Sequence, residues 1–222
     1  QQSGKSRYLC MIAPEGKIIL IPLLLLVLAG TGIQAYYPSD GLKWMNLTVA
    51  VLTLFSLYFF RDPQRIPPNN DGFLSPGDGK VVQIIDVEDA DIGQAKQISI
   101  FLSVFNVHIQ RVPLSGKVIS KVYNPGKFLA AFNHKASLDN EQTVVMFETE
   151  SGKRYKIKQI AGLIARRILN YMEPENIVER GQRLGFIRFG SRVDIIVPED
   201  FQIDVSLGDM VRGNQTIIGR FK

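Results

Sequence analysis

Three short stretches of the sequence contain side chains that could do nucleophilic chemistry together. "SPGDGKV" holds Asp78 between two glycines, "FLSVFNVHIQRVP" holds His108 within an apolar run, and "LGFIRFGSRV" contains the step from Gly190 to Ser191. A carboxylate can orient an imidazole, and an oriented imidazole can remove the proton of a hydroxyl. The three stretches therefore hold the parts of a catalytic triad, with Ser191 as the nucleophile.

Each of these residues also has a structural explanation. Aspartate between glycines is typical of a turn, a lone histidine in an apolar strand is more often a core residue, and Gly-Ser at a strand end is usually a turn. A hydrolase of external substrates would hold its serine in a GxSxG turn ahead of a helix, but "FGSRV" lacks the second glycine. Hydrolysis of an external substrate is therefore a poor fit, and the residues by themselves only permit a triad.

Residues 64–222, which carry all three stretches, are expected to form one mainly β domain. Short runs of β-branched residues bounded by glycine, proline, asparagine and aspartate favour an antiparallel sandwich or barrel-sandwich-like fold with one or two short helices. The clearest helix is "LIARRILNYM" over residues 163–172, where apolar residues share one helical face. The expected strands are "KVVQIIDVE", "QISIFLS", "HIQRVP", "GKVISKVYN", "TVVMFETE", "RYKIKQIAG", "RLGFIRFG", "RVDIIVP" and "TIIGRF".

Residues 1–63 differ in composition and predict a transmembrane α-hairpin. Helices are expected at about 18–36 and 44–60, because neither stretch carries a charged residue and a membrane-spanning helix needs about 20 apolar residues. Between them, "YYPSDGLKW" has aromatic residues where an interfacial belt would lie. A cleaved signal peptide and a buried hairpin of a soluble protein are the alternatives.

Basic residues set the expected orientation of this hairpin. Three of them precede the first helix, Arg61 and Arg65 follow the second, and the turn has only Lys43. The positive-inside tendency then puts both ends of the hairpin, and the β domain, on the cytoplasmic face of the cell membrane.

The composition narrows the classes of partner and cofactor. A net charge of +5 over 222 residues fits an anionic partner, either a membrane or a nucleic acid. The membrane is favoured, because the charge is dispersed and no aromatic-basic motif of nucleic-acid binding is present. The single cysteine, Cys10, and the two histidines, His108 and His134, argue against a disulfide framework and against a metal site.

Longer motifs along the chain carry a family resemblance. In order, they are "FFRDPQRIPP", "SPGDGKV", "FLSVFNVHIQRVPLSGKV", "NPGKFLAAFNHKASLDNEQ", "QIAGLIARRI" and "VERGQRLGFIRFGSRVDIIVP". Together they resemble the phosphatidylserine decarboxylase proenzymes of the short bacterial and archaeal type. Longer members of that family have Leu-Gly-Ser-Thr at the cleavage motif, whereas this chain has Phe189, Gly190, Ser191 and Arg192.

The resemblance implies autocatalytic serinolysis between Gly190 and Ser191, into a large chain 1–190 and a small chain 191–222. Ser191 would become a pyruvoyl group, a covalent cofactor that decarboxylates phosphatidylserine to phosphatidylethanolamine without a metal. His108, oriented by Asp78, would be the base for cleavage and the proton donor after loss of CO2.

The resemblance also implies a phospholipid substrate with an anionic headgroup. Basic residues are candidates to bind it, and the ones singled out are His134, Lys135, Arg166 and Arg192, with Arg111, Lys127 and Arg167 as further candidates. The partners implied are the lipid and the two chains of the same proenzyme, with no nucleic acid. Whether the protein forms a homodimer is left open.

Two other functions compete with this one. A membrane-anchored barrel-sandwich adaptor without catalysis would explain the hairpin, but not the set of Asp78, His108 and Ser191. A pyruvoyl decarboxylase of a soluble amino acid would explain that set, but not the hairpin.

Overall fold

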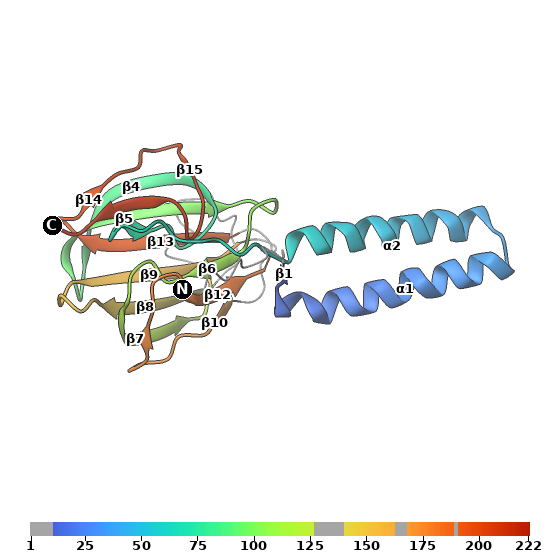
Figure 1. The fold of residues 1–222 in the computed structure, drawn as a ribbon, viewed down its shortest axis with the longest axis horizontal. Coiled ribbons are helices and arrows are strands. Elements are labelled where there is room, and N and C mark those ends of the chain that lie inside the picture. Colours follow the sequence, from blue (N-terminus) through green and yellow to red (C-terminus); the bar gives the residue numbers. More distant parts are fainter. Residues whose placement is uncertain (1–10, 127–139, 163–167, 189–190) are drawn as a thin grey trace, which may run out of the picture. The chain divides into compact units, whose positions relative to one another are not determined.

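The structure is a computed structural model that describes residues 11–126, 140–162, 168–188 and 191–222. The chain divides into two compact units, Gln1–Gln64 and Arg65–Lys222. The first unit is helical and the second is mainly β (Figure 1), which confirms the fold class predicted from the sequence.

The first unit is a helical hairpin closed by a short β ladder. Helix α1 spans Lys17–Tyr36 and helix α2 spans Asp40–Phe59. Strand β1 (Met11–Ile12) pairs antiparallel with strand β2 (Arg61–Asp62), and a 3-10 turn, η1 (Pro14–Gly16), leads into α1. The β1–β2 pairing thereby joins the segment before α1 to the segment after α2.

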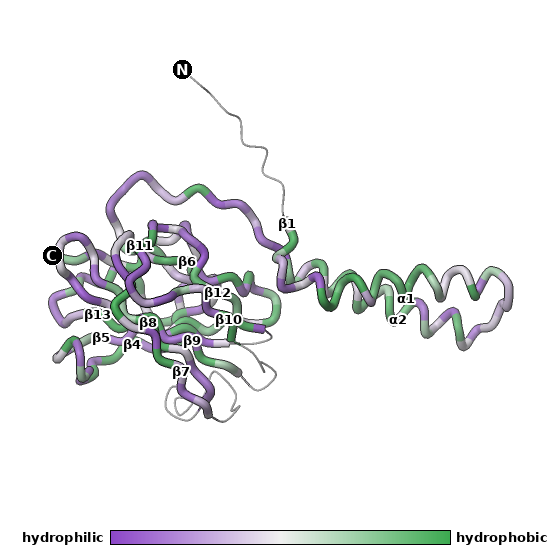
Figure 2. The backbone as a smooth tube through the Cα atoms, turned by 90° about the horizontal axis from the view of Figure 1, so that it is seen from below, coloured by the Kyte–Doolittle hydropathy of each residue, from purple (hydrophilic) through white to green (hydrophobic). Residues whose placement is uncertain are grey.

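Helices α1 and α2 are apolar along most of their length, and the turn between them is polar (Figure 2). Both are long and apolar enough to cross a membrane, which is consistent with membrane association. They approach closely at Gly30, where a Cβ would lie 2.6 Å from Asn46 Oδ1. Helix α2 begins at Asp40, earlier than predicted, because the Lys43 amide already donates to the Ser39 carbonyl at 3.0 Å.

The second unit is built on an eight-stranded antiparallel sheet that curls into a half-barrel (Figure 1). Its strand order is β11-β7-β8-β9-β13-β5-β4-β15. The bounds are β4 Gly79–Asp89, β5 Gly93–Leu102, β7 Gly116–Asn124, β8 Gln142–Glu148, β9 Arg154–Ala161, β11 Ile177–Val178, β13 Ser191–Pro198 and β15 Met210–Val211. Strand β13 is central in this sheet, between β9 and β5.

Two smaller sheets complete the unit. One has the order β10-β12-β6 and the other has the order β14-β16-β3. Their bounds are β3 Phe73–Leu74, β6 Ile109–Arg111, β10 Ile168–Asn170, β12 Arg183–Ile187, β14 Gln202–Ile203 and β16 Ile217–Arg220. Every strand quoted from the sequence overlaps an observed strand.

The apolar core lies on one face of the large sheet. Alternate residues of the central strands, such as Ile98 and Ile100 of β5 and Val193 and Ile195 of β13, are fully buried in it. The opposite face of β13 is buried as well, and its first two residues, Arg192 and Asp194, are charged; Asp194 has no exposed surface.

The predicted helix over residues 163–172 is wrong for its described part. Residues Ile168–Asn170 form strand β10, which pairs antiparallel with β12 through Ile168 and Ile187, among others. The free edge of β12 offers backbone partners that outweigh a helical spacing of only a few apolar residues. Residues 163–167 lie outside the described part of the chain.

Candidate active site

Ser191 is the first residue of strand β13, opposite Leu102 of β5 and Ala161 of β9. It is fully buried, and in the described part of the chain its Oγ has no hydrogen-bond partner. A buried hydroxyl without a partner costs about 1–3 kcal/mol, so Ser191 does not serve stability. Within the described residues, no hydrogen bond fixes the orientation of the Ser191 hydroxyl.

His108 lies in the connection between β5 and β6, and it is fully buried. That connection starts after Leu102, the strand partner of Ser191, so His108 and Ser191 belong to the same end of the sheet. His108 Nδ1 lies 3.0 Å from the Asn106 carbonyl oxygen, a partner that can only accept. The proton therefore sits on Nδ1 in the neutral ring, which leaves Nε2 as the basic nitrogen.

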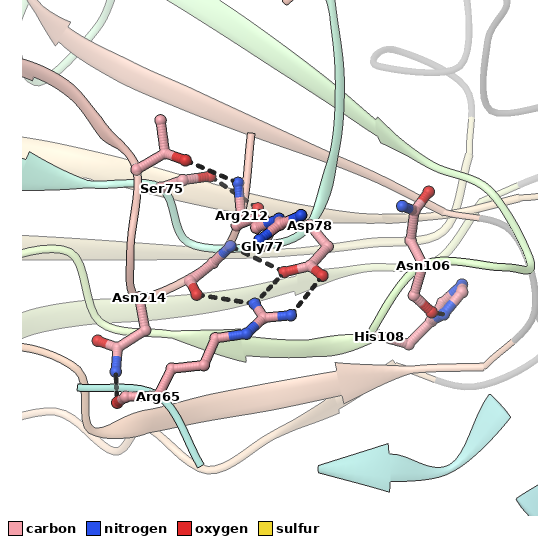
Figure 3. A network of polar contacts seen from close by, with 10 residues as sticks. Arg65, Ser75, Gly77, Asp78, Asn106, His108, Arg212 and Asn214 are labelled. Carbon is pink, nitrogen blue, oxygen red and sulfur yellow. Dashed lines mark hydrogen bonds and ion pairs between the residues drawn. The ribbon is translucent and has the colours of Figure 1, made fainter. Parts of the chain in front are cut away.

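Asp78 lies in the turn before β4 and is held by two partners (Figure 3). Its carboxylate accepts from both terminal nitrogens of Arg65, with Nη2 at 2.7 Å, and from the Gly213 amide at 2.8 Å. Arg65 Nη1 also donates to the Gly213 carbonyl at 2.9 Å. The ion pair is nearly buried, so Asp78 is a firmly held anion.

The predicted orientation of His108 by Asp78 is not made by a direct hydrogen bond here. Both residues lie in the described part of the chain, and the hydrogen bonds of the Asp78 carboxylate there run to Arg65 and Gly213. In Figure 3 the His108 ring lies beside Asn106 and apart from that carboxylate.

Arg192 follows Ser191 on β13, but its side chain points to the opposite, polar face of the sheet. It is 1% exposed, and its Nε donates to Asp194 Oδ1 at 2.6 Å. Its Nη2 donates to Gln83 Oε1 and to Ser99 Oγ, both at 2.7 Å. A guanidinium that is buried and bound in this way is not presented to a lipid headgroup, so the geometry favours a structural role for Arg192.

Comparison with models of protein families identifies the family of this chain. The family model described as "Phosphatidylserine decarboxylase" matches residues 52–219. The chain belongs to the phosphatidylserine decarboxylase family.

Several curated relatives carry the name "Phosphatidylserine decarboxylase proenzyme". The protein of Desulfotalea psychrophila is 47% identical over 171 residues, which are 76% of this chain and 80% of the relative. That of Pelobacter propionicus is 48% identical over 173 residues, 77% of this chain and 79% of the relative. That of Chlorobium chlorochromatii is 40% identical over 213 residues, 95% of this chain and the full length of the relative.

The other predicted site residues of this family member divide into two groups. Gly190, His134, Lys135, Arg166, Lys127 and Arg167 lie outside the described residues. Arg111 is described, and its Nη1 donates to the Gly181 carbonyl at 3.1 Å. Asn140 directly follows the stretch with His134, and its Nδ2 donates at 2.7 Å to the carbonyl of Ala161, the strand partner of Ser191.

Sequence reasoning missed Arg65, which was used only to orient the hairpin. A lone arginine in a linker rich in proline and asparagine does not indicate a partner. Only the folded structure brings Arg65 into contact with Asp78. Sequence reasoning also missed Gln110 and Gln159, two buried glutamines in apolar strands. A polar residue at a core position of a strand was the available signal.

Among the residues that the structure describes, no cluster of three or more histidine, cysteine, aspartate or glutamate side chains could hold a metal ion.

The buried ion pair of Arg192 and Asp194 gives a stability prediction. Asp194→Ala would leave a buried, uncompensated guanidinium, so the free energy of unfolding is expected to fall by about 3–5 kcal/mol. The double variant Arg192→Met with Asp194→Leu should lose less, because no charge stays buried. Urea unfolding in detergent, on a Ser191→Ala background that keeps one chain, measures both. A double variant less stable than the single one would contradict the structural role.

Proposed function

We propose that this protein decarboxylates phosphatidylserine to phosphatidylethanolamine, with a pyruvoyl group that it makes from its own Ser191. Membership of the decarboxylase family, and relatives named as proenzymes, support both parts of the proposal. The observation that carries it is the buried Ser191 hydroxyl, which has no hydrogen-bond partner among the described residues, at the start of a central strand.

Self-cleavage is proposed to begin with attack of Ser191 Oγ on the carbonyl carbon of Gly190. His108 takes the hydroxyl proton and passes it to the nitrogen of residue 191 as the C–N bond breaks, so that an ester replaces the amide. Removal of the α-proton of residue 191 then breaks the Cβ–Oγ bond and releases the large chain as a carboxylate. The remaining dehydroalanine takes up water, loses ammonia and becomes the pyruvoyl group.

The position of Ser191 fits such a group. Its Oγ has no side-chain partner to lose among the described residues, and the strand partners Leu102 and Ala161 hold the backbone on both sides. A pyruvoyl ketone at this position would supply an electron sink for the decarboxylation of a substrate with a primary amine. His108 is proposed to deliver the proton that replaces the carboxylate.

Asp78 is proposed to orient His108, and this role requires it to exchange a bond to Arg65 for one to the imidazole. For the headgroup, His134, Lys135 and Arg166 stay the proposed ligands, because a phosphate and a carboxylate need cationic or hydrogen-bonding partners. Arg192 is not among them, since Asp194 already binds its guanidinium.

Cleavage is proposed to leave the two chains, 1–190 and 191–222, interlocked. The small chain would contribute β13 between β5 and β9, β15 beside β4, and β16 beside β3. Its Gly213 amide also binds Asp78 of the large chain. The chains should therefore stay together after the bond is cut.

The helical hairpin is proposed to hold the enzyme at the membrane that contains its lipid substrate. A tethered enzyme meets its substrate by search in two dimensions, and the basic residues at the ends of the hairpin favour the cytoplasmic face of the cell membrane.

Intact-mass spectrometry tests the proposal first. Under denaturing conditions we expect two chains, 1–190 and 191–222, with the small chain lighter than its serine form by the mass of one ammonia molecule. Under native conditions in detergent the two should elute as one complex. A single uncut chain, even after incubation with phosphatidylserine vesicles, would overturn the proposal and favour the adaptor.

The substrate is tested with the processed protein. Release of CO2 from phosphatidylserine in mixed micelles, with none from free serine, is the expected result. Release from free serine alone would instead identify a decarboxylase of a soluble amino acid.

A further inference from the structure

Three side-chain amides, two of them fully buried, form a continuous hydrogen-bonded chain that ends on the backbone of His108. Asn170 Nδ2 donates to Gln159 Oε1 at 2.7 Å, and Gln159 Nε2 donates to Gln110 Oε1 at 2.9 Å. Gln110 Nε2 then donates to the His108 carbonyl oxygen at 2.7 Å. We call Asn170, Gln159 and Gln110 the amide relay; it joins strands β10, β9 and β6.

The stability of the fold by itself does not explain the amide relay. Gln110 and Gln159 are fully buried, and a buried glutamine loses both hydration and rotamer freedom. Replacing both partners of a buried hydrogen bond by apolar groups of the same shape is often neutral or stabilising. A core built only for stability would therefore do as well with leucine or methionine at these positions.

The far end of the relay is anchored. Asn170 Oδ1 accepts from the Met172 amide at 3.0 Å, and the Asn170 carbonyl accepts from Lys121 Nζ at 3.4 Å. Lys121 in turn pairs with Glu173 at 2.7 Å. Each amide thus has its orientation fixed by the one before it.

Strand β12, which leads to Ser191, leaves room for the relay at Gly185. A Cβ on Gly185 would lie 2.6 Å from Gln159 Nε2 and 2.2 Å from the Leu169 carbonyl oxygen, so a larger residue would displace the relay. The relay therefore contacts both the segment with His108 and the strand that precedes the cleavage site.

The His108 carbonyl oxygen accepts its shorter described hydrogen bond from Gln110 Nε2, at 2.7 Å. The Ile187 amide also points to this oxygen, but at 3.4 Å, which is long for a hydrogen bond. Without Gln110, the backbone of His108 would lose its closest described hydrogen-bond partner at that oxygen.

We propose that Gln110 and Gln159 are positioning residues, which hold the His108 backbone so that its imidazole meets Ser191. This inference rests on the proposed role of His108 as the base of self-cleavage. The relay then sets the rate of cleavage and of later turnover, while the fold depends on it only weakly.

Two substitutions of Gln110 separate positioning from packing. In Gln110→Glu, a protonated carboxyl can still donate to the His108 carbonyl and accept from Gln159, whereas the ionised form cannot donate. Burial raises the pKa of a carboxyl, so the protonated form persists to higher pH than for an exposed glutamate. Gln110→Leu keeps the approximate volume but cannot donate at any pH.

The measurement is the rate of small-chain release from full-length precursor, made in a short cell-free pulse with detergent and chased across a pH series. Gln110→Leu is expected to cleave about 10–100-fold more slowly at every pH, as for a misplaced catalytic group. Gln110→Glu should approach the wild-type rate at acid pH and fall toward that of Gln110→Leu as pH rises. Gln159→Leu should slow cleavage as well.

Gln97→Leu is the matched control, because Gln97 is also buried but binds Ser99, away from the relay. Wild-type cleavage rates in Gln110→Leu, or an equal loss in Gln97→Leu, would overturn the inference. So would a ratio of Gln110→Glu to wild type that does not change with pH. An uncut wild-type precursor would instead refute the proposed function itself.

Discussion

Ser191→Ala is expected to leave one full-length chain without decarboxylase activity. The substitution removes both the proposed nucleophile and the source of the proposed pyruvoyl group, so the loss should be complete rather than partial. It also removes a buried hydroxyl that has no hydrogen-bond partner among the described residues. The variant should therefore be more stable than the uncut wild-type precursor, by about 1–3 kcal/mol.

Gel analysis, intact mass and CO2 release from phosphatidylserine measure this result. Ser206→Ala, an exposed position of the proposed small chain, is the control and should cleave normally. Ser191→Cys keeps a nucleophile at the same place, so slow cleavage is expected. A cleaved and active Ser191→Ala protein would refute the chemistry proposed for this residue.

His108→Ala is expected to slow self-cleavage by about 10²–10⁴-fold, the usual contribution of a general base. The physical reason is that Nδ1 is tied to the Asn106 carbonyl, which leaves Nε2 as the basic nitrogen at the Ser191 end of the sheet. The half-time of small-chain release from the precursor measures the effect. Turnover of any protein that does cleave should fall as well.

Two further variants keep this result interpretable. His108→Gln retains a donor toward Asn106 but has no base, so it should be as slow as His108→Ala with a smaller cavity. His134→Ala, the other histidine of the chain, should still cleave. Normal cleavage in both His108 variants, with failure in His134→Ala, would move the base to His134.

The sequence alone determined the division of the chain into an apolar helical region and a β-rich region, and the order of the motifs along it. Two uncharged apolar stretches predicted the hairpin, and short runs of β-branched residues bounded by turn residues predicted the strands of the second unit. It also singled out Ser191, through its combination with Asp78 and His108 and through motifs that resemble those of the decarboxylase proenzymes.

Tertiary structure decided which polar groups meet and which faces are covered. Alternation puts Arg192 on the face opposite Ser191, but only the fold shows that this face is also buried and that Asp194 binds the guanidinium there. Likewise, residues 168–170 became a strand because the edge of β12 was available to them.

The same reason explains the partners that the sequence did not reveal. Asp78 pairs with Arg65 and with Gly213, and the second lies at the far end of the chain. Gln110 and Gln159 meet only because β6 and β9 come together across the core. Hydrogen bonds between distant strands depend on sheet order and register, which local periodicity does not encode. The residue types of a motif and the length of an apolar stretch are instead properties of the sequence itself.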